Sequence, residues 1–237
     1  MPRNARSLVP GVPYHVTQRG TDRQKVFFSI QDRKVYLDLL HQNLADAGVR
    51  LLAYCLMTNH IHAVVTPERG DSLAVLFRRV HGRYAQYLNA RMGRSGHLWQ
   101  ARFYSCPLAE GHLDTPLRYV ECNPVRARLV DEPWAYRWSS AAAHTAGLRD
   151  GGWLDPEIWR ERGGAAGWRE LLAGSELAPV IHMLRRCTYA GRPFGGEEFV
   201  AAMESALNRR WQRWPFEQTL VDAELVVRWE AARGTEL

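Results

Sequence analysis

Two histidines one residue apart, His60 and His62, are the side chains in this sequence best suited to hold a metal ion. Residues 60–65 are rich in apolar and β-branched side chains and are predicted to form a strand. Because side chains alternate along a strand, both imidazoles point to one face of the sheet and Ile61 points to the other. At a separation of about 6–7 Å they can bind one divalent cation together. Two partly exposed sheet histidines without a metal are the alternative.

A tyrosine and an asparagine in a later helix are the candidate partners of this pair. Tyr119 and Asn123 lie four residues apart and share one face of a helix that begins near Pro116. If that face packs over the histidines, the Asn123 amide oxygen completes a neutral metal site, which suits Mg²⁺ or Mn²⁺. The Tyr119 phenol can then attack a phosphodiester and form a phosphotyrosine. On spacing alone, the more common interpretation is that Tyr119 is a core or interface residue and that Asn123 ends the helix before Pro124.

The positive charge is concentrated in the first part of the chain. Residues 1–144 carry a net charge of +8, from 19 Lys and Arg against 11 Asp and Glu, whereas residues 145–237 carry −2, from 12 against 14. Proteins hold single strands with phosphates on arginine and bases on aromatic rings. A solvated arginine face on an ordinary helix would give the same pattern. The candidate DNA-binding residues near Tyr84, Tyr87 and Tyr119 are Arg78, Arg79, Arg83 and Arg126.

Several other classes of protein are disfavoured. The sequence contains no Walker-type glycine loop and no Gly-x-Ser-x-Gly motif, so ATP use and serine hydrolase chemistry have no support. The four cysteines are far apart and form no CxxC pair, which argues against a zinc ribbon or a disulfide framework. No apolar run reaches the ~18 residues of a membrane span, and no signal-peptide pattern follows Arg3 and Arg6. We therefore expect a cytoplasmic protein with no membrane partner.

The elements that must position these side chains are predicted by hydrophobic periodicity and by turn residues. A hairpin turn at 57–59 joins two strands, Gly48 ends the first helix, and Pro124 is expected to stop the helix that carries Tyr119. The predicted strands are 14–18, 49–56 and 60–65, and residues 98–108 are also expected to have β character. The predicted helices are 30–47, 72–88, 115–122 and 197–210. This order indicates an α+β domain on a mainly antiparallel sheet. Small residues at 145–152 divide the chain into a domain of residues 1–145 and a mainly helical segment of residues 146–237.

Four motifs in register resemble the single-tyrosine HUH transposases, in particular the branch associated with repetitive extragenic palindromes (REPs) in bacterial genomes. The resemblance covers about residues 8–145. It rests on PYHVTQRG at 13–20, MTNHIH at 57–62, GHLWQARF at 96–103 and YVECNPVRA at 119–127.

The resemblance implies a role for each matched residue. His60 and His62 would bind Mg²⁺ or Mn²⁺ with Asn123 as the third ligand, and Tyr119 would attack the DNA strand. It also implies a ferredoxin-like antiparallel sheet with helices on one face, across which the tyrosine helix lies. Such proteins cut single-stranded DNA beside palindromic hairpins, form a 5′-phosphotyrosine and free a 3′-hydroxyl without ATP. The expected location is the cytoplasm, at the nucleoid.

Other features are less well defined by the resemblance. Arg19 and Arg23 lie in a block after the first strand that is expected to contact the hairpin. Residues 146–237 are interpreted as an accessory DNA-binding or packing segment, and the protein as a monomer or homodimer. Two alternatives to a strand transferase remain open: a regulator that binds hairpin DNA without cutting it, and a phosphodiesterase that uses activated water.

Overall fold

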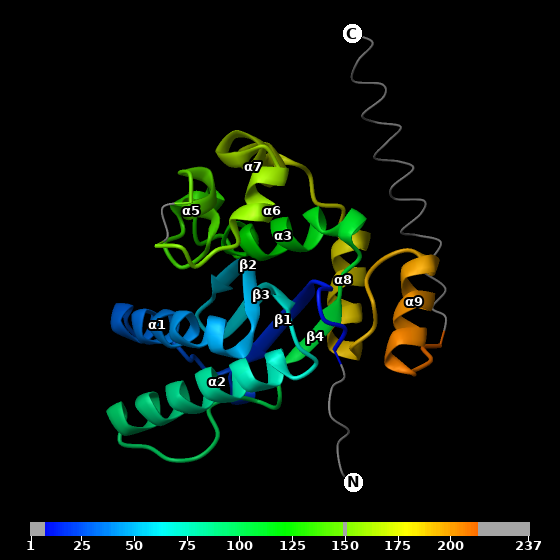
Figure 1. The fold of residues 1–237 in the computed structure, drawn as a ribbon. Coiled ribbons are helices and arrows are strands. Elements are labelled where there is room, and N and C mark those ends of the chain that lie inside the picture. Colours follow the sequence, from blue (N-terminus) through cyan, green and yellow to red (C-terminus); the bar gives the residue numbers. More distant parts are fainter. Residues whose placement is uncertain (1–7, 149–150, 213–237) are drawn as a thin grey trace.

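The computed structural model describes residues 8–148 and 151–212 (Figure 1). At its centre is a four-stranded antiparallel sheet with the strand order β2-β3-β1-β4. The strands are β1 (Tyr14–Arg19), β2 (Val49–Leu56), β3 (His60–Pro67) and β4 (Tyr104–Pro107). Helix α1 (Ile30–Ala47) joins β1 to β2, and α2 (Ser72–Arg91) joins β3 to β4. This is the ferredoxin-like βαββαβ order, so the predicted fold class is confirmed.

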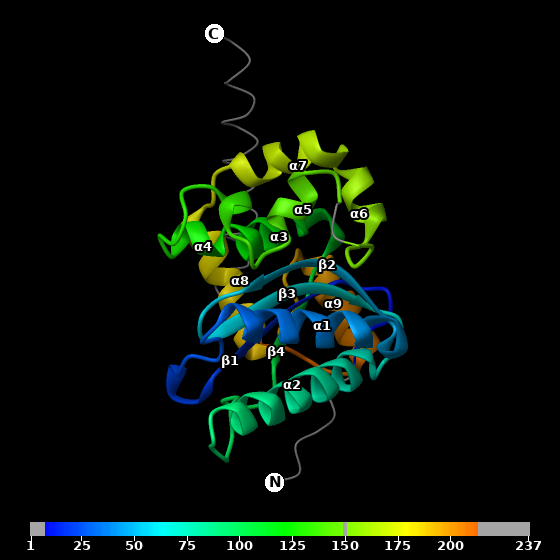
Figure 2. The ribbon, with the colours of Figure 1, turned by 90° about the vertical axis from the view of Figure 1, so that its left-hand side faces the viewer.

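The chain after β4 is helical. Its helices are α3 (Asp114–Glu121), α4 (Asn123–Arg126), α5 (Ala141–Thr145), α6 (Pro156–Glu161), α7 (Gly164–Ala173), α8 (Ala178–Ala190) and α9 (Glu197–Leu207). Single 3₁₀ turns are η1 (Thr21–Arg23), η2 (Glu110–His112) and η3 (Pro133–Ala135). Figure 2 shows α1 and α2 on one side of the sheet and α3, α5 and α7 on the other. Across the described residues, no helix has the length and apolar character needed to span a membrane.

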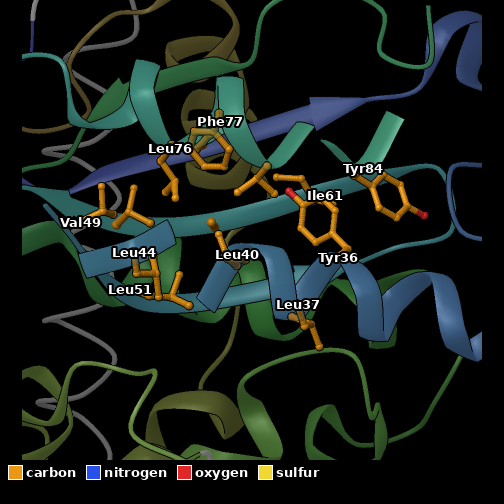
Figure 3. Close-up of a cluster of buried hydrophobic side chains, with 14 of the residues drawn as sticks. Tyr36, Leu37, Leu40, Leu44, Val49, Leu51, Ile61, Leu76, Phe77 and Tyr84 are labelled. Carbon is orange, nitrogen blue, oxygen red and sulfur yellow. The ribbon is translucent and has the colours of Figure 1, made fainter. Parts of the chain in front are cut away.

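The first face of the sheet is covered by α1 and α2. A capping box between Ser29 and Asp32 begins α1, and Gly48, in the left-handed conformation at φ 60°, ends it as predicted. Figure 3 shows apolar side chains of both helices meeting those of the strands, among them Leu40 and Ile61, each 2% exposed. This cluster fixes which face of β3 is apolar, and so leaves the opposite face for the histidines.

The second face is covered by helices from beyond β4. Cys55, Val64 and Cys106 of the sheet belong to one buried cluster with Leu117 of α3 and Trp168 of α7. Leu184 of α8 and Phe194 are buried in the same cluster, with at most 1% exposed. The described part of the segment after residue 145 therefore packs directly on the sheet.

Two predicted elements differ in detail. Only residues 104–107 of the stretch 98–108 form a strand, while Trp99 makes an isolated bridge to Gly20. The helix that carries Tyr119 ends before Pro124 as predicted, at Glu121, but a short second helix, α4, begins at Asn123. In the first turn of α4 the missing N–H of proline costs nothing, since that group has no intrahelical acceptor there.

Candidate active site

Strand β3 presents two imidazoles on one face of the sheet. The ring centres of His60 and His62 lie 4.9 Å apart, and the rings are nearly perpendicular, at 87°. Ile61 between them is buried in the apolar cluster on the opposite face. The predicted alternation is therefore confirmed, and the two histidines are close enough to bind one ion together.

Burial keeps both imidazoles neutral. With the nearby charges of Arg19 and Arg185, it lowers the pKa of His60 from 6.5 to about 4. Burial, followed by the influence of His60 and His15, holds the pKa of His62 well below 6.5. A neutral imidazole keeps the lone pair that binds a metal, so at neutral pH no proton competes for these nitrogens.

A third histidine, His15 on β1, belongs to the site and was not among the predicted residues. Its ring stacks on that of His62, with centres 5.1 Å apart and an interplanar angle of 9°. Its Nε2 lies 2.9 Å from Nδ1 of His62, and its Nδ1 lies 2.7 Å from Oγ1 of Thr188 on α8. Alternation along β1 places His15 and Thr17 on one face, but only the strand pairing brings that face beside His62.

The hydrogen bonds of Thr188 fix the tautomers of both rings. Its hydroxyl donates to the carbonyl oxygen of Leu184, at 2.8 Å, and therefore accepts from Nδ1–H of His15. His15 Nε2 then has a lone pair and accepts from Nδ1–H of His62. The remaining nitrogen of His62, Nε2, is left with the free lone pair that a metal requires.

Helix α3 places Tyr119 against these histidines of its own chain. Its ring lies edge-on to His62 and His15, at 5.4 and 5.6 Å between ring centres. The side chain is 4% exposed. One polypeptide therefore brings together the tyrosine and the histidine pair.

Two arginines enclose the tyrosine ring. Arg185 of α8 donates from Nε to the Tyr119 hydroxyl at 3.1 Å, and its guanidinium carbon lies 5.4 Å from the ring centre. Arg126 lies closer to the ring, at 4.3 Å, and donates to the Tyr119 carbonyl oxygen. Both oxygens of Glu176 accept from Nη1 of Arg126, each at 2.6 Å. Arg126, predicted to contact DNA, thus lies in the site with a paired charge, whereas Arg185 is exposed.

Asn123 is buried and is the first residue of α4, so it does not share a continuous helix with Tyr119 as predicted. Its amide nitrogen is buried without a hydrogen-bond partner. Within the described ranges, no three His, Cys, Asp or Glu side chains gather as a metal site, so the two imidazoles would need a further donor to hold an ion. The unpartnered amide N–H groups cannot bind a cation, so Asn123 could serve only through its oxygen. Two imidazoles and an amide oxygen form a neutral donor set, which suits a hard divalent cation that keeps its charge for a phosphate.

The opposite side of α3 is held by a buried carboxylate. Glu121 is two residues from Tyr119 and is completely buried. It accepts hydrogen bonds from Ser140 Oγ, from His144 Nδ1 at 2.7 Å and from Trp168 Nε1 at 2.8 Å. These bonds tie the tyrosine helix to α5 and α7 and thereby fix its rotation over the sheet.

The remaining predicted arginines lie in two separate places. Arg19 is opposite His60 in the β1–β3 register, and Arg23 is exposed in η1 with φ 58°. Three others, on α2, are exposed on the side of the molecule away from the histidines: Arg78, Arg79 and Arg83. The structure brings Arg19, but not the α2 arginines, to the site.

These features define a ferredoxin-like domain in which a His-x-His strand faces a tyrosine helix. Residues 9–123 match the model of the family described as IS200-like transposases, so this part of the chain is similar to that family. The matched residues include the histidine pair and Tyr119 and end at Asn123. Arg185 and Thr188 lie beyond them.

One solved structure agrees with this fold. A REP-associated tyrosine transposase bound to a REP hairpin is 16% identical, with a TM-score of 0.52 over 65% of this chain and 98% of that chain. A putative transposase from Deinococcus radiodurans is 17% identical, with a TM-score of 0.35 over 54% of this chain and 92% of that chain. Among curated proteins, no match was found.

Proposed function

We propose that this protein is a metal-dependent endonuclease and strand transferase that cuts single-stranded DNA beside palindromic hairpins through a 5′-phosphotyrosine. The observation that carries the proposal is the contact of Tyr119 with neutral His62 of the same chain, under the guanidinium of Arg185. The hairpin bound to the REP-associated transposase of similar fold supports this choice of substrate.

His60, His62 and the Asn123 oxygen would hold Mg²⁺ or Mn²⁺, which polarises the scissile phosphate and offsets its charge. The Tyr119 oxygen forms a bond to phosphorus while the bond from phosphorus to O3′ breaks. The phenol loses its proton and the leaving oxygen gains one, which gives a 3′-hydroxyl. The Nε–H of Arg185 stabilises the negative charge that develops on the phenol oxygen.

The phosphodiester energy is kept in the phosphotyrosine, so rejoining needs no ATP. A single chain holds every group of this mechanism, so a monomer would suffice for cleavage, although a homodimer is compatible with it. Chromosomal hairpins would place the protein at the nucleoid in the cytoplasm.

A hairpin-binding regulator that does not cut is the second candidate. It is favoured by one observation: the Tyr119 ring is 4% exposed and lies between two arginines, so DNA must displace a side chain to reach it.

The test uses end-labelled hairpin oligonucleotides from DNA that flanks the gene, incubated with the protein and Mg²⁺ or Mn²⁺. We expect a denaturation-resistant adduct that peptide mass spectrometry maps to Tyr119. Tyr119→Phe should abolish the adduct and keep hairpin binding, whereas Tyr87→Phe, on the far side of the sheet, should retain cleavage. Cleavage by Tyr119→Phe would indicate activated water instead, and tight binding without nicking by the wild type would leave only the regulator.

A further inference from the structure

A groove begins beside the candidate active site and extends from there along β4. Its first part is a cavity of about 380 Å³ lined by Thr17, Arg19, Arg23, Gln100, Tyr104 and Tyr189. Its second part, about 840 Å³, lies between β4 and the ends of α8 and α9. Tyr104 and Tyr189 line both cavities, so the two are continuous.

The groove begins at the catalytic histidines. Thr17 is opposite His62 in the sheet register, and Arg19 is opposite His60. The charge of Arg19 contributes to the lowered pKa of both histidines. A polymer lying in the groove would therefore reach the proposed cleavage site directly.

The lining of the groove is basic. Arg19 and Arg23 line the smaller cavity, and Arg102 and Arg209 line the larger one. Among the described residues that line either cavity, none is Asp or Glu. The Nε–H of Arg19 is buried without a hydrogen-bond partner, and donors of this kind bind phosphate oxygens. The charge therefore favours a polyanion.

Aromatic rings stand between the two pairs of arginines. Tyr189, near the end of α8, is 50% exposed, and its ring centre lies 5.0 Å from that of Tyr104 at an interplanar angle of 69°. Alternating cationic side chains and accessible aromatic faces are typical of surfaces that bind unpaired nucleic acid, because every base has a face that can stack. Duplex DNA has no such free base faces.

We propose that this groove binds the unpaired DNA flank of the hairpin, with a base stacked on Tyr189 and phosphates on the arginines. The proposal builds on the proposed function, since it assigns the path by which a single strand reaches Tyr119. It places part of the DNA surface on α8, outside the stretch that matches the family model.

The test measures binding without cleavage. The probes are a fluorescent hairpin with a short unpaired flank and the same hairpin with no flank, titrated by anisotropy in EDTA. Tyr189→Ala should weaken binding of the flanked hairpin by roughly 5-fold to more than 100-fold, the loss expected for one stacked base. Binding of the blunt hairpin should be unchanged. Tyr189→Phe, which keeps the ring, should bind both probes like the wild type.

A second variant tests the phosphate contacts. Arg209→Gln should lower the slope of log affinity against log salt by about 1 for the flanked hairpin only. Three results would overturn the proposal that the groove binds the flank: an equal loss of affinity for both probes in the variants, no loss for either probe, or a wild-type protein that does not prefer the flanked probe. The assay needs neither metal nor Tyr119, so it tests the groove separately from cleavage. If Tyr189→Ala weakens binding of the flanked hairpin but no adduct forms on Tyr119, the cleavage proposal fails and the groove proposal stands. If the adduct forms but the variant binds both probes like the wild type, only the groove proposal fails.

Discussion

Replacement of Thr188 by valine is the most informative single change, because it removes one hydroxyl and keeps the shape. The hydroxyl accepts from His15 Nδ1–H and so directs the free lone pair of His62 to Nε2. In Thr188→Val the buried N–H loses its acceptor, which costs about 1–3 kcal/mol of folding stability. The two rings can avoid this cost only if both exchange tautomers.

The exchange would place a proton on His62 Nε2. A metal could then bind only after the original tautomers are restored. The cost of the unpaired N–H would therefore reduce the free energy of metal binding. Loss of a hydrogen bond behind a metal-binding histidine typically costs 10–100-fold in affinity, or about 1.4–2.7 kcal/mol. We expect a reduction of that size for Mn²⁺.

Calorimetric titration with Mn²⁺ would measure this affinity, and ¹⁵N NMR of the imidazoles would report the tautomers without metal. Thr188→Ser restores the hydroxyl and should recover both signals. A valine variant with wild-type Mn²⁺ affinity, stability and imidazole spectra would refute the assigned hydrogen-bond direction. If wild-type protein binds no Mn²⁺ but the valine variant still changes the tautomers, the metal proposal fails and the hydrogen-bond chain stands.

Two further predictions concern stability. Glu121→Ala leaves the buried N–H groups of His144 and Trp168 without an acceptor, whereas Ser140 Oγ can still donate to the Tyr54 carbonyl oxygen. It should lower the free energy of unfolding in urea by about 3–5 kcal/mol, while Glu121→Gln should lose less. A loss below 1 kcal/mol from the alanine variant would contradict this role. Burial lowers the pKa of His81 from 6.5 to about 3, so below pH 6.5 protons bind the unfolded chain more than the folded one. Stability should fall by about 2.3 kcal/mol per such histidine between pH 6.5 and 4.5, and His81→Gln should reduce the fall by that amount; unchanged pH dependence would contradict the assignment.

The sequence was most informative where local rules act. Strand alternation placed His60 and His62 on one face, and Gly48 ended α1 where its conformational freedom was needed. The four-residue spacing predicted a common helix face for Tyr119 and Asn123 but could not show which face packs on the sheet. Tyr119 does lie against the histidines, whereas Asn123 begins a separate helix.

Contacts between distant residues could not be predicted in the same way. His15 lies 47 residues from His62, and Arg185 lies 66 residues from Tyr119. Neither pair has a periodic signal, because both depend on how β1 and α8 pack against the central strands. The arginines of α2 gave a clear sequence signal, yet the helix turns them away from the site. Net charge was also a poor guide to the residues of the site, since residues 145–237, which carry a net negative charge, supply Arg185.

The buried cluster shared by the sheet and α7 and α8 bears on any shortened form of this protein. Trimming the chain to the 9–123 stretch would remove the members of this cluster that come from α7 and α8, among them Trp168 and Leu184, and would uncover part of the sheet at Cys106, which contacts Thr188. It would also remove Glu176, Arg185 and Thr188 from the site. A minimal nuclease derived from this chain must therefore extend at least through α8, or a new apolar cover must be supplied for the sheet, because the bare surface would promote aggregation.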